Sequence, residues 1–146
     1  MREDAVTSVL FVCLGNICRS PTAHGVFASL VEERGLGARV HVDSCGTGGW
    51  HVGEAPDSRA TREASLRGYD LSRLRARQFM PEDFQRFQYI LAMDYSNLQD
   101  LQALCPAQYS GHLGLFLPFA ADAEAEEVPD PYYGGADGFT RVLDLV

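Results

Sequence analysis

The sequence predicts an α/β fold: a single open, four-stranded parallel sheet with helices on both faces. Two patterns in the chain predict it. Short, apolar runs rich in β-branched and aromatic residues alternate with segments whose apolar residues recur at helical spacing. A run that is apolar throughout is typical of a strand buried on both sides, as in a parallel sheet covered by helices. With 146 residues and 46% hydrophobic content, residues 1–146 are expected to form one domain.

The first strand and the helix after it have the clearest signals. Residues 7–12 are β-rich and apolar, and they run directly into Cys13. Ser20 and Pro21 mark a helix start, because proline is favoured at the first helical position, and Gly35 is the expected end. The other expected strands are residues 40–44, 89–93 and 113–117, and the other expected helices are residues 57–67, 81–87, 94–104 and 138–146.

Composition argues against several classes of function. The formal net charge is −8, whereas nucleic-acid-binding proteins carry a surplus of basic residues to neutralise phosphates. All 12 basic residues are arginine, so neither a phosphate-binding lysine nor a Schiff-base lysine is available. The longest apolar run near the start is too short to span a bilayer, and Glu3 and Asp4 stand where a signal peptide would carry positive charge. We therefore expect a cytoplasmic protein with neither nucleic-acid nor membrane partners.

One loop carries the strongest functional signal. Cys13 and Arg19 flank a glycine-containing loop between a buried strand and a helix start. Main-chain N–H groups of such a loop can converge on a phosphate, the helix end adds partial positive charge, and the guanidinium can bind two phosphate oxygens at once. Parallel sheets bind ligands beyond the carboxyl ends of their strands, where this loop lies. The residues expected to surround the anion are Leu14, Gly15, Asn16, Ile17 and Cys18.

The same surroundings favour the charged form of the Cys13 thiol. A helix N-terminus and a neighbouring arginine both stabilise a thiolate, which is the nucleophilic form of cysteine. The alternative is that Cys13 is a small buried residue that ends a strand, the usual role of an isolated cysteine. The spacing to Arg19, the glycine between them and the Ser20-Pro21 helix start favour the reactive role.

These residues resemble the low-molecular-weight protein tyrosine phosphatases. The amino-terminal signature of the family is similar to residues 12–21 (VCLGNICRSP), and a second signature is similar to residues 130–133 (DPYY) in an acidic loop at residues 121–131. Further segments that look like the family are residues 44–48, 76–78 and 93–98. The resemblance therefore spans nearly the whole chain. It implies a bacterial enzyme that hydrolyses phosphotyrosine in proteins or small aryl phosphates through a phosphocysteine on Cys13, with no cofactor and no metal.

The resemblance also assigns roles to residues far from the loop. Asp130 is implied to protonate the leaving oxygen and then, as a carboxylate, to activate the water that hydrolyses the phosphocysteine. Pro131 would help to aim it, although an Asp before a Pro is more often a turn residue. The aromatic residues implied to wall the substrate pocket are Trp50, Tyr132 and Tyr133. The alternative, strongest for Tyr133, is that these rings pack their loops onto the core.

Three polar residues match a family network that holds the loop and stabilises the thiolate, namely Asn16, Ser20 and Ser44. Ser20 can also be a helix cap. The resemblance implies that Cys18 forms a reversible disulfide with Cys13 and so protects it from over-oxidation. The alternative for Cys18 is a core thiol on the inner side of the loop.

Two features depart from the family pattern. Many relatives have a histidine that supports the loop asparagine at the position of Leu74, so this part of the network lacks its family residue. The last helix of relatives continues beyond the position of Val146, and we expect some loss of core burial there.

Three other functions fit the sequence less well. An arsenate reductase is similar in fold and cysteine loop but needs further cysteines that relay a disulfide, and Cys45 and Cys105 are isolated. A non-catalytic anion-binding module would leave Asp130 without a task. A metal enzyme needs ligands at coordinating spacing, whereas the histidines are scattered. Vanadate and phosphate are expected to compete with the substrate of a phosphatase.

Overall fold

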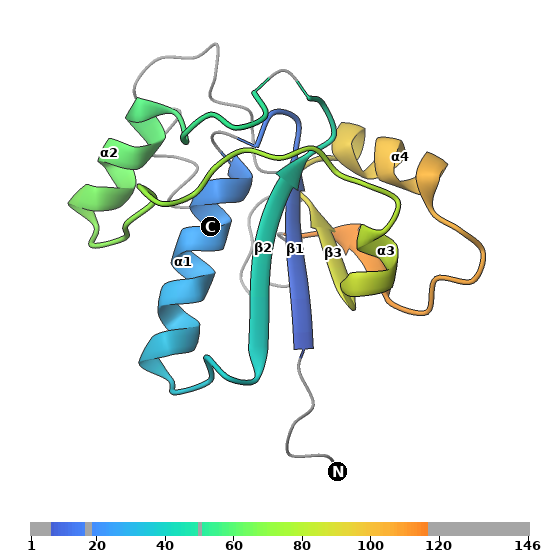
Figure 1. Ribbon diagram of the computed structural model, residues 1–146, viewed down its shortest axis with the longest axis horizontal. Helices are drawn as coiled ribbons and strands as arrows, with labels where there is room; N and C mark the ends of the chain where they lie inside the picture. The colour runs from blue at the N-terminus through green and yellow to red at the C-terminus, as the bar shows by residue number, and fades with distance from the viewer. Residues whose placement is uncertain (1–6, 17–18, 50, 117–146) are drawn as a thin grey trace.

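The computed structural model describes residues 7–16, 19–49 and 51–116, which form one parallel sheet flanked by helices. The strand order is β2-β1-β3-β4, and neighbouring strands are parallel throughout (Figure 1). The predicted four-stranded parallel sheet is therefore confirmed. Its strands are β1 (Thr7–Cys13), β2 (Val40–Gly46), β3 (Tyr89–Ala92) and β4 (His112–Leu115).

The path of the chain opens a crevice at the carboxyl end of β1. From β1 the chain crosses to β2 on one side, and it later returns to β3 on the other side of β1. Where the connections from two neighbouring strands run in opposite directions, the loops at the carboxyl ends of those strands are separated by a crevice. Open parallel sheets bind ligands in this crevice. The register pairs Cys13 with Gly46 and Val12 with Ala92. The ends of β2 and β3 therefore lie beside the end of β1 at Cys13, and we call residues 13–19 the cysteine loop.

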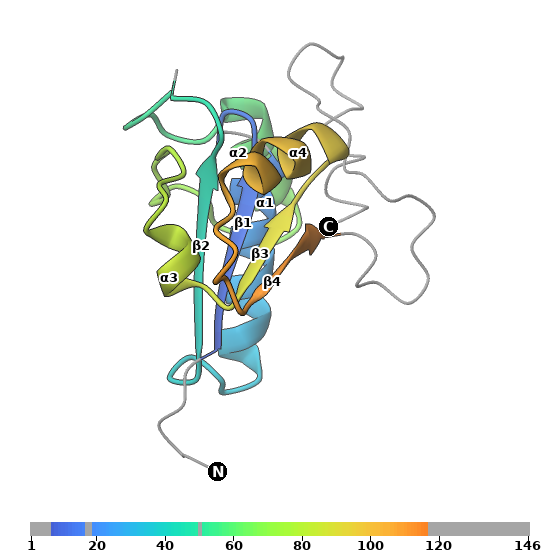
Figure 2. The same cartoon turned by 90° about the vertical axis from the view of Figure 1, so that its right-hand side faces the viewer.

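Helices cover both faces of the sheet, as predicted. Figures 1 and 2 show α1 and α2 on one side of the sheet and α3 and α4 on the other. α1 packs against β1 and β2, whereas α4 packs against β3 and β4. The helices are α1 (Arg19–Glu33), α2 (Ser58–Leu66), α3 (Asp83–Arg86) and α4 (Tyr95–Leu104).

Aspartate side chains cap two of these helices. The Asp57 carboxylate accepts a hydrogen bond from the Arg59 main-chain N–H at 2.8 Å at the start of α2. Asp94 accepts one from the Asn97 main-chain N–H, also at 2.8 Å, at the start of α4. Each bond satisfies an N–H group that has no partner within the helix. The Asp57 and Asp94 side chains thus mark the starts of two helices that the sequence predicted to begin at these residues.

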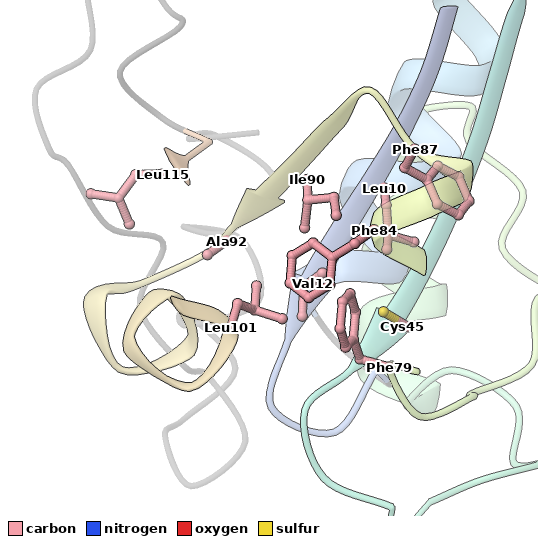
Figure 3. Close-up of a cluster of buried hydrophobic side chains, with 10 residues drawn as sticks. All are labelled: Leu10, Val12, Cys45, Phe79, Phe84, Phe87, Ile90, Ala92, Leu101 and Leu115. Atoms are coloured by element: carbon pink, nitrogen blue, oxygen red, sulfur yellow. The ribbon is translucent and has the colours of Figure 1, made fainter. Parts of the chain in front are cut away.

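Each face of the sheet has its own apolar core. Alternate residues of β1 point to opposite faces: Leu10 and Val12 enter the cluster under α3 and α4, whereas Val9, Phe11 and Cys13 enter the cluster under α1. Burial on both sides explains why β1 is apolar throughout. Figure 3 shows the first cluster, which comprises Leu10, Val12, Cys45, Phe79, Phe84, Phe87, Ile90, Ala92, Leu101 and Leu115.

The described elements differ from the predicted ones mainly at their ends. α3 is shorter than the predicted helix at residues 81–87, because residues 81–82 form a turn and Phe87 is extended. Residue 117 of the predicted fourth strand, the acidic loop at residues 121–131 and the predicted helix at residues 138–146 lie outside the described residues. Within the described part of the chain, no helix is long and apolar enough to cross a membrane.

Candidate active site

Cys13 ends β1 at the bottom of the crevice, with only 3% of its surface exposed. Two groups from the following turn and helix contact its sulfur. The Asn16 main-chain N–H donates to Sγ at 3.3 Å, and the Ser20 Oγ lies 3.0 Å from Sγ. Hydrogen bonds to the charged form of a titratable group favour that form. The sulfur is therefore placed among donors that stabilise a thiolate.

Asn16 adopts a left-handed backbone conformation, with φ 59°. Asparagine tolerates this conformation better than most residues, and such strain persists when surrounding contacts hold it in place. Its side chain makes two such contacts. The Nδ2 group donates to Ser20 Oγ at 2.7 Å, and Oδ1 accepts from the Arg77 main-chain N–H at 3.0 Å. The main-chain N–H of Asn16 is thus one donor to the sulfur, and the Asn16 side chain orients the other donor, the Ser20 hydroxyl.

Leu74 stands where the family resemblance implies a histidine that supports Asn16, yet Asn16 keeps both of its side-chain hydrogen bonds. Leu74 packs instead against the small cluster formed by Ala64 and Leu71. The Asn16 side chain is held by Ser20 and by the main chain of Arg77, neither of which depends on a side chain at position 74.

Ser20 lies at the centre of the predicted network. Its hydroxyl oxygen accepts from Asn16 and also lies 3.3 Å from the Cys45 carbonyl oxygen. A hydroxyl has one proton to donate, so Ser20 can serve either Cys13 or the Cys45 carbonyl at a given moment. Since a charged acceptor forms the stronger bond, ionisation of the sulfur turns the hydroxyl toward Cys13.

Ser44, a predicted member of this network, has a hydrogen-bond partner on α1. Its Oγ pairs with the Nδ1 atom of His24 at 2.9 Å, which joins β2 to α1. Ser44 therefore reaches Ser20 only through the main chain of the adjacent Cys45. Burial lowers the pKa of His24, the negative charge of Asp43 opposes that effect, and His41 adds to it. The imidazole is thus neutral at neutral pH.

Arg19 begins α1 with its side chain only 3% exposed, and its Nη1 donates to Asp94 Oδ2 at 2.6 Å. Asp94 is the N-cap of α4, just after β3, so this ion pair joins the cysteine loop to the neighbouring strand and helix across the crevice. The sequence alone predicted no role for Asp94 at the site. An aspartate between a strand and a helix at the carboxyl edge of the sheet is the signal that would have singled it out.

Arg77, for which the sequence alone predicted no role either, holds the cysteine loop from behind. Its main-chain N–H binds Asn16, and its carbonyl accepts from the Gly46 N–H at 2.9 Å. Its guanidinium binds both carboxylate oxygens of Asp83, at 3.0 and 3.1 Å, and Oδ2 of Asp43 at 3.1 Å. Because Asp83 is fully buried, these ion pairs fix the segment that supports the loop.

The end of β2 approaches the cysteine loop closely at Gly46. The Thr47 N–H donates to the Cys13 carbonyl and the Gly48 N–H to the Leu14 carbonyl, both at 2.9 Å. A Cβ atom at Gly46 would lie 2.6 Å from the Leu14 carbonyl oxygen, inside van der Waals contact. A glycine is therefore required here, and the two segments form one unit.

The other described thiols do not adjoin the Cys13 sulfur. Cys45 enters the apolar cluster on the opposite face of the sheet from Cys13 (Figure 3). Burial raises the pKa of the Cys45 thiol well above its ordinary value, and the positive charge of Arg77 only partly opposes this. Cys105 follows α4 and is partly exposed. Cys13, Cys45 and Cys105 are free thiols.

Some features lie away from this site or outside the described chain. A cleft of about 860 Å³ is at the other end of the sheet, where Ser8, His41 and His112 begin their strands. Among the described residues, no three His, Cys, Asp or Glu side chains cluster as metal ligands. The predicted site residues outside the described chain are Ile17, Cys18, Trp50, Asp130, Tyr132 and Tyr133.

The described geometry supports nucleophilic chemistry on an anion. A thiol faces two hydrogen-bond donors, a guanidinium begins the adjacent helix, and the loop between them lies at the crevice of a parallel sheet. A thiolate in such a place can attack a phosphorus atom while main-chain N–H groups receive the surrounding oxygens.

Comparison with known proteins connects this geometry to one family. Residues 8–146 match the family model described as low molecular weight phosphotyrosine protein phosphatase. A protein of that name from Schizosaccharomyces pombe is 48% identical over 132 residues, which are 90% of this chain and 84% of that protein. The crystal structure of YfkJ from Bacillus subtilis matches with a TM-score of 0.91 at 37% identity, covering 99% of this chain and 89% of the other. A protein tyrosine phosphatase from Entamoeba histolytica with Hepes in the active site gives 0.90 at 41% identity, covering 95% and 88%.

Gly46→Ala is expected to displace the cysteine loop, since the added methyl group would meet main-chain atoms that cannot move alone. A misplacement of about 1 Å in an active site costs on the order of 100-fold in rate, and we expect a loss of that size in aryl phosphate hydrolysis. Gly37→Ala is the matched control, because a Cβ at Gly37 would meet nothing within 4 Å. Equal rates for the two variants would contradict the close approach.

Arg77→Met is expected to lower the free energy of unfolding by about 3–5 kcal/mol, because it leaves the buried Asp83 carboxylate without its partner. Urea denaturation followed by circular dichroism measures this. Arg59→Met removes an exposed ion pair with Asp57 and is expected to cost less than about 1 kcal/mol. The prediction is wrong if the two substitutions cost the same.

His24 is expected to make the protein less stable in mild acid. Because the folded-state pKa lies below the unfolded value of 6.5, the unfolded chain binds more protons as the pH falls through 6.5, which favours unfolding. The stabilising contribution is therefore present above that pH and lost below it. Between neutral pH and about pH 5, His24→Gln should flatten the decline in urea midpoint, whereas the exposed-site control His112→Gln should follow the wild type. A wild-type midpoint independent of pH in this range would contradict the assignment.

Proposed function

Since this chain belongs to the low molecular weight phosphotyrosine protein phosphatase family, we propose that it hydrolyses phosphotyrosine and small aryl phosphates through a phosphocysteine on Cys13. The observation that carries this proposal is the pair of donors on the sulfur, the Asn16 N–H at 3.3 Å and the Ser20 hydroxyl at 3.0 Å. They place two hydrogen-bond donors against the sulfur that acts as the nucleophile in this mechanism. We propose residues 1–146 as one catalytic domain.

In the first proposed step, the Cys13 thiolate attacks phosphorus and a sulfur–phosphorus bond replaces the bond to the aryl oxygen. Main-chain N–H groups of the cysteine loop and the guanidinium of Arg19 receive the phosphoryl oxygens. The ion pair with Asp94 supports this role, because it fixes the guanidinium at the crevice before substrate arrives. The departing phenoxide takes a proton from Asp130, a role that rests on the family signature at residues 130–133.

In the second proposed step, water attacks the phosphocysteine. Asp130, now a carboxylate, takes a proton from that water, inorganic phosphate leaves, and the Cys13 thiolate and the protonated Asp130 are restored. The same donors that stabilise the attacking sulfur also stabilise it as the leaving group. Phosphate and vanadate are therefore expected to bind competitively.

We propose that Trp50 and Tyr132, together with Tyr133, wall the site and favour the flat ring of phosphotyrosine. We also propose that Cys18 protects Cys13 through a reversible disulfide. A free nucleophilic thiol requires a reducing compartment, and we propose that the enzyme works in the cytoplasm. The position of Cys45 on the opposite face of the sheet favours hydrolysis over arsenate reduction, which would need further thiols that relay a disulfide away from the cysteine loop.

Cys13→Ser is expected to abolish release of phosphate from an aryl phosphate, because an alcohol does not replace the thiolate as a nucleophile. Cys105→Ser is the matched control and should retain activity. Phosphate release that survives in Cys13→Ser would exclude the covalent route.

Asp130→Asn is expected to reduce kcat by roughly 10²–10⁴-fold with phosphotyrosine, because the phenoxide then departs without a proton. The loss should shrink with aryl phosphates whose phenols are more acidic, since those leaving groups need less assistance. Steady-state rates over a series of aryl phosphates measure this. A loss that is the same for every leaving group would contradict the role of Asp130 as general acid.

A further inference from the structure

A second, smaller cleft adjoins the cysteine loop on the α4 side of the sheet. Its volume is about 220 Å³, and its lining includes Leu14, Thr47, Gln78, Leu101 and Leu104. We propose that this cleft is a subsite for an aliphatic side chain that lies close to the phosphotyrosine in a protein substrate. The inference rests on the proposed function and extends it from the phosphorylated ring to the polypeptide that carries the ring.

The position of the cleft is fixed relative to the nucleophile. Leu14 is the residue after Cys13 and forms one wall. Thr47 and Gly48 also line the cleft. Their main-chain N–H groups donate hydrogen bonds to the Cys13 and Leu14 carbonyls at 2.9 Å, so this side of the cleft is attached to the cysteine loop. A substrate whose phosphate lies in the cysteine loop therefore meets this cleft in one defined place.

The lining of the cleft suits an aliphatic group. Leu101 is fully buried and provides an apolar floor that continues into the core cluster shown in Figure 3. Leu14 is 39% exposed and Leu104 is 54% exposed, so two leucines at the cleft present apolar surface to water. An aliphatic side chain between them would remove that surface from water, which is favourable. The volume accommodates one side chain rather than a folded segment.

Polar groups at the cleft narrow the choice of ligand. Asp100 lines the cleft and is exposed, so an acidic side chain from the substrate would be repelled. The Gln78 Nε2 group donates to the Thr47 carbonyl at 3.2 Å, which ties two sides of the cleft together. The site therefore favours an aliphatic neighbour of phosphotyrosine and rejects an acidic one.

An extended substrate brings a suitable side chain to this place. Along an extended chain, residues two positions apart project on the same side, about 7 Å from each other. A residue within two positions of the phosphotyrosine can therefore enter a cleft that begins one residue from the nucleophile. The cleft therefore distinguishes substrates by a residue close to the phosphotyrosine in the sequence, and not by a distant docking segment.

The test compares phosphotyrosine peptides that carry Leu, Ala or Glu at each position from two before to two after the phosphotyrosine. In the wild type, leucine at one of these positions is expected to raise kcat/KM by about tenfold over alanine, and glutamate to lower it. In Leu104→Ala and Leu104→Asp, the advantage of leucine is expected to fall to about twofold or less. Leu66→Ala and Leu66→Asp are matched controls, because Leu66 is 73% exposed on α2 and lies outside the cleft.

Hydrolysis of a small aryl phosphate, which is too short to reach the cleft, separates the two proposals. Absence of that hydrolysis in the wild type would sink the proposed function and this subsite with it. If the small aryl phosphate is hydrolysed but leucine gives no advantage at any peptide position, the subsite proposal alone is wrong. The same conclusion follows if the advantage of leucine is equal in the Leu104 and Leu66 variants. A Leu104 variant that loses aryl phosphate hydrolysis as well would place its effect in the catalytic site and equally overturn the subsite.

Discussion

The interaction on which the structure around Cys13 depends is the set of hydrogen bonds to its buried sulfur, which carries a negative charge in the proposed mechanism. Charge removed from water is costly unless hydrogen bonds replace the lost hydration. Both described donors to this sulfur depend on Asn16, whose N–H contacts Sγ and whose amide orients Ser20. The left-handed conformation of Asn16 places the main chain and the side chain for these two tasks at once. Its conformational strain is held by Ser20 on one side and Arg77 on the other.

The proposed anion site is compatible with a net charge of −8, because it uses local charge. Arg19 begins the helix above the sheet and is paired with Asp94, whereas Arg77 is paired with Asp43 and Asp83. The two arginines differ in task. Arg19 belongs to the loop itself, and Arg77 supports the loop from behind through its main chain. In the proposed mechanism, main-chain dipoles and the fixed guanidinium of Arg19 thus meet a requirement that overall charge does not express.

The parallel sheet separates two neighbouring thiols. Cys13 and Cys45 lie on neighbouring strands but project to opposite faces, so the proposed nucleophile and the second thiol belong to different clusters. The small cleft is lined by Leu101 of the cluster under α3 and α4, whereas Cys13 belongs to the cluster under α1. The contacts of Asn16 with Ser20 and with the Arg77 main chain do not involve the side chain at position 74.

The sequence by itself determined the strands, the helix starts and the identity of the cysteine loop, because these depend on short segments. The apolar run that leads into Cys13, the Ser20-Pro21 helix start and the caps at Asp57 and Asp94 are all local features. Only the tertiary structure decided which side chains meet. Arg19 pairs with Asp94, 75 residues later, and Asn16 is held by Arg77, 61 residues later. Ser44, a predicted member of the polar network, contacts His24 on α1. The register of β1 against β2 and β3 and the packing of α1 on the sheet create these pairs, and no pattern within a single segment encodes either.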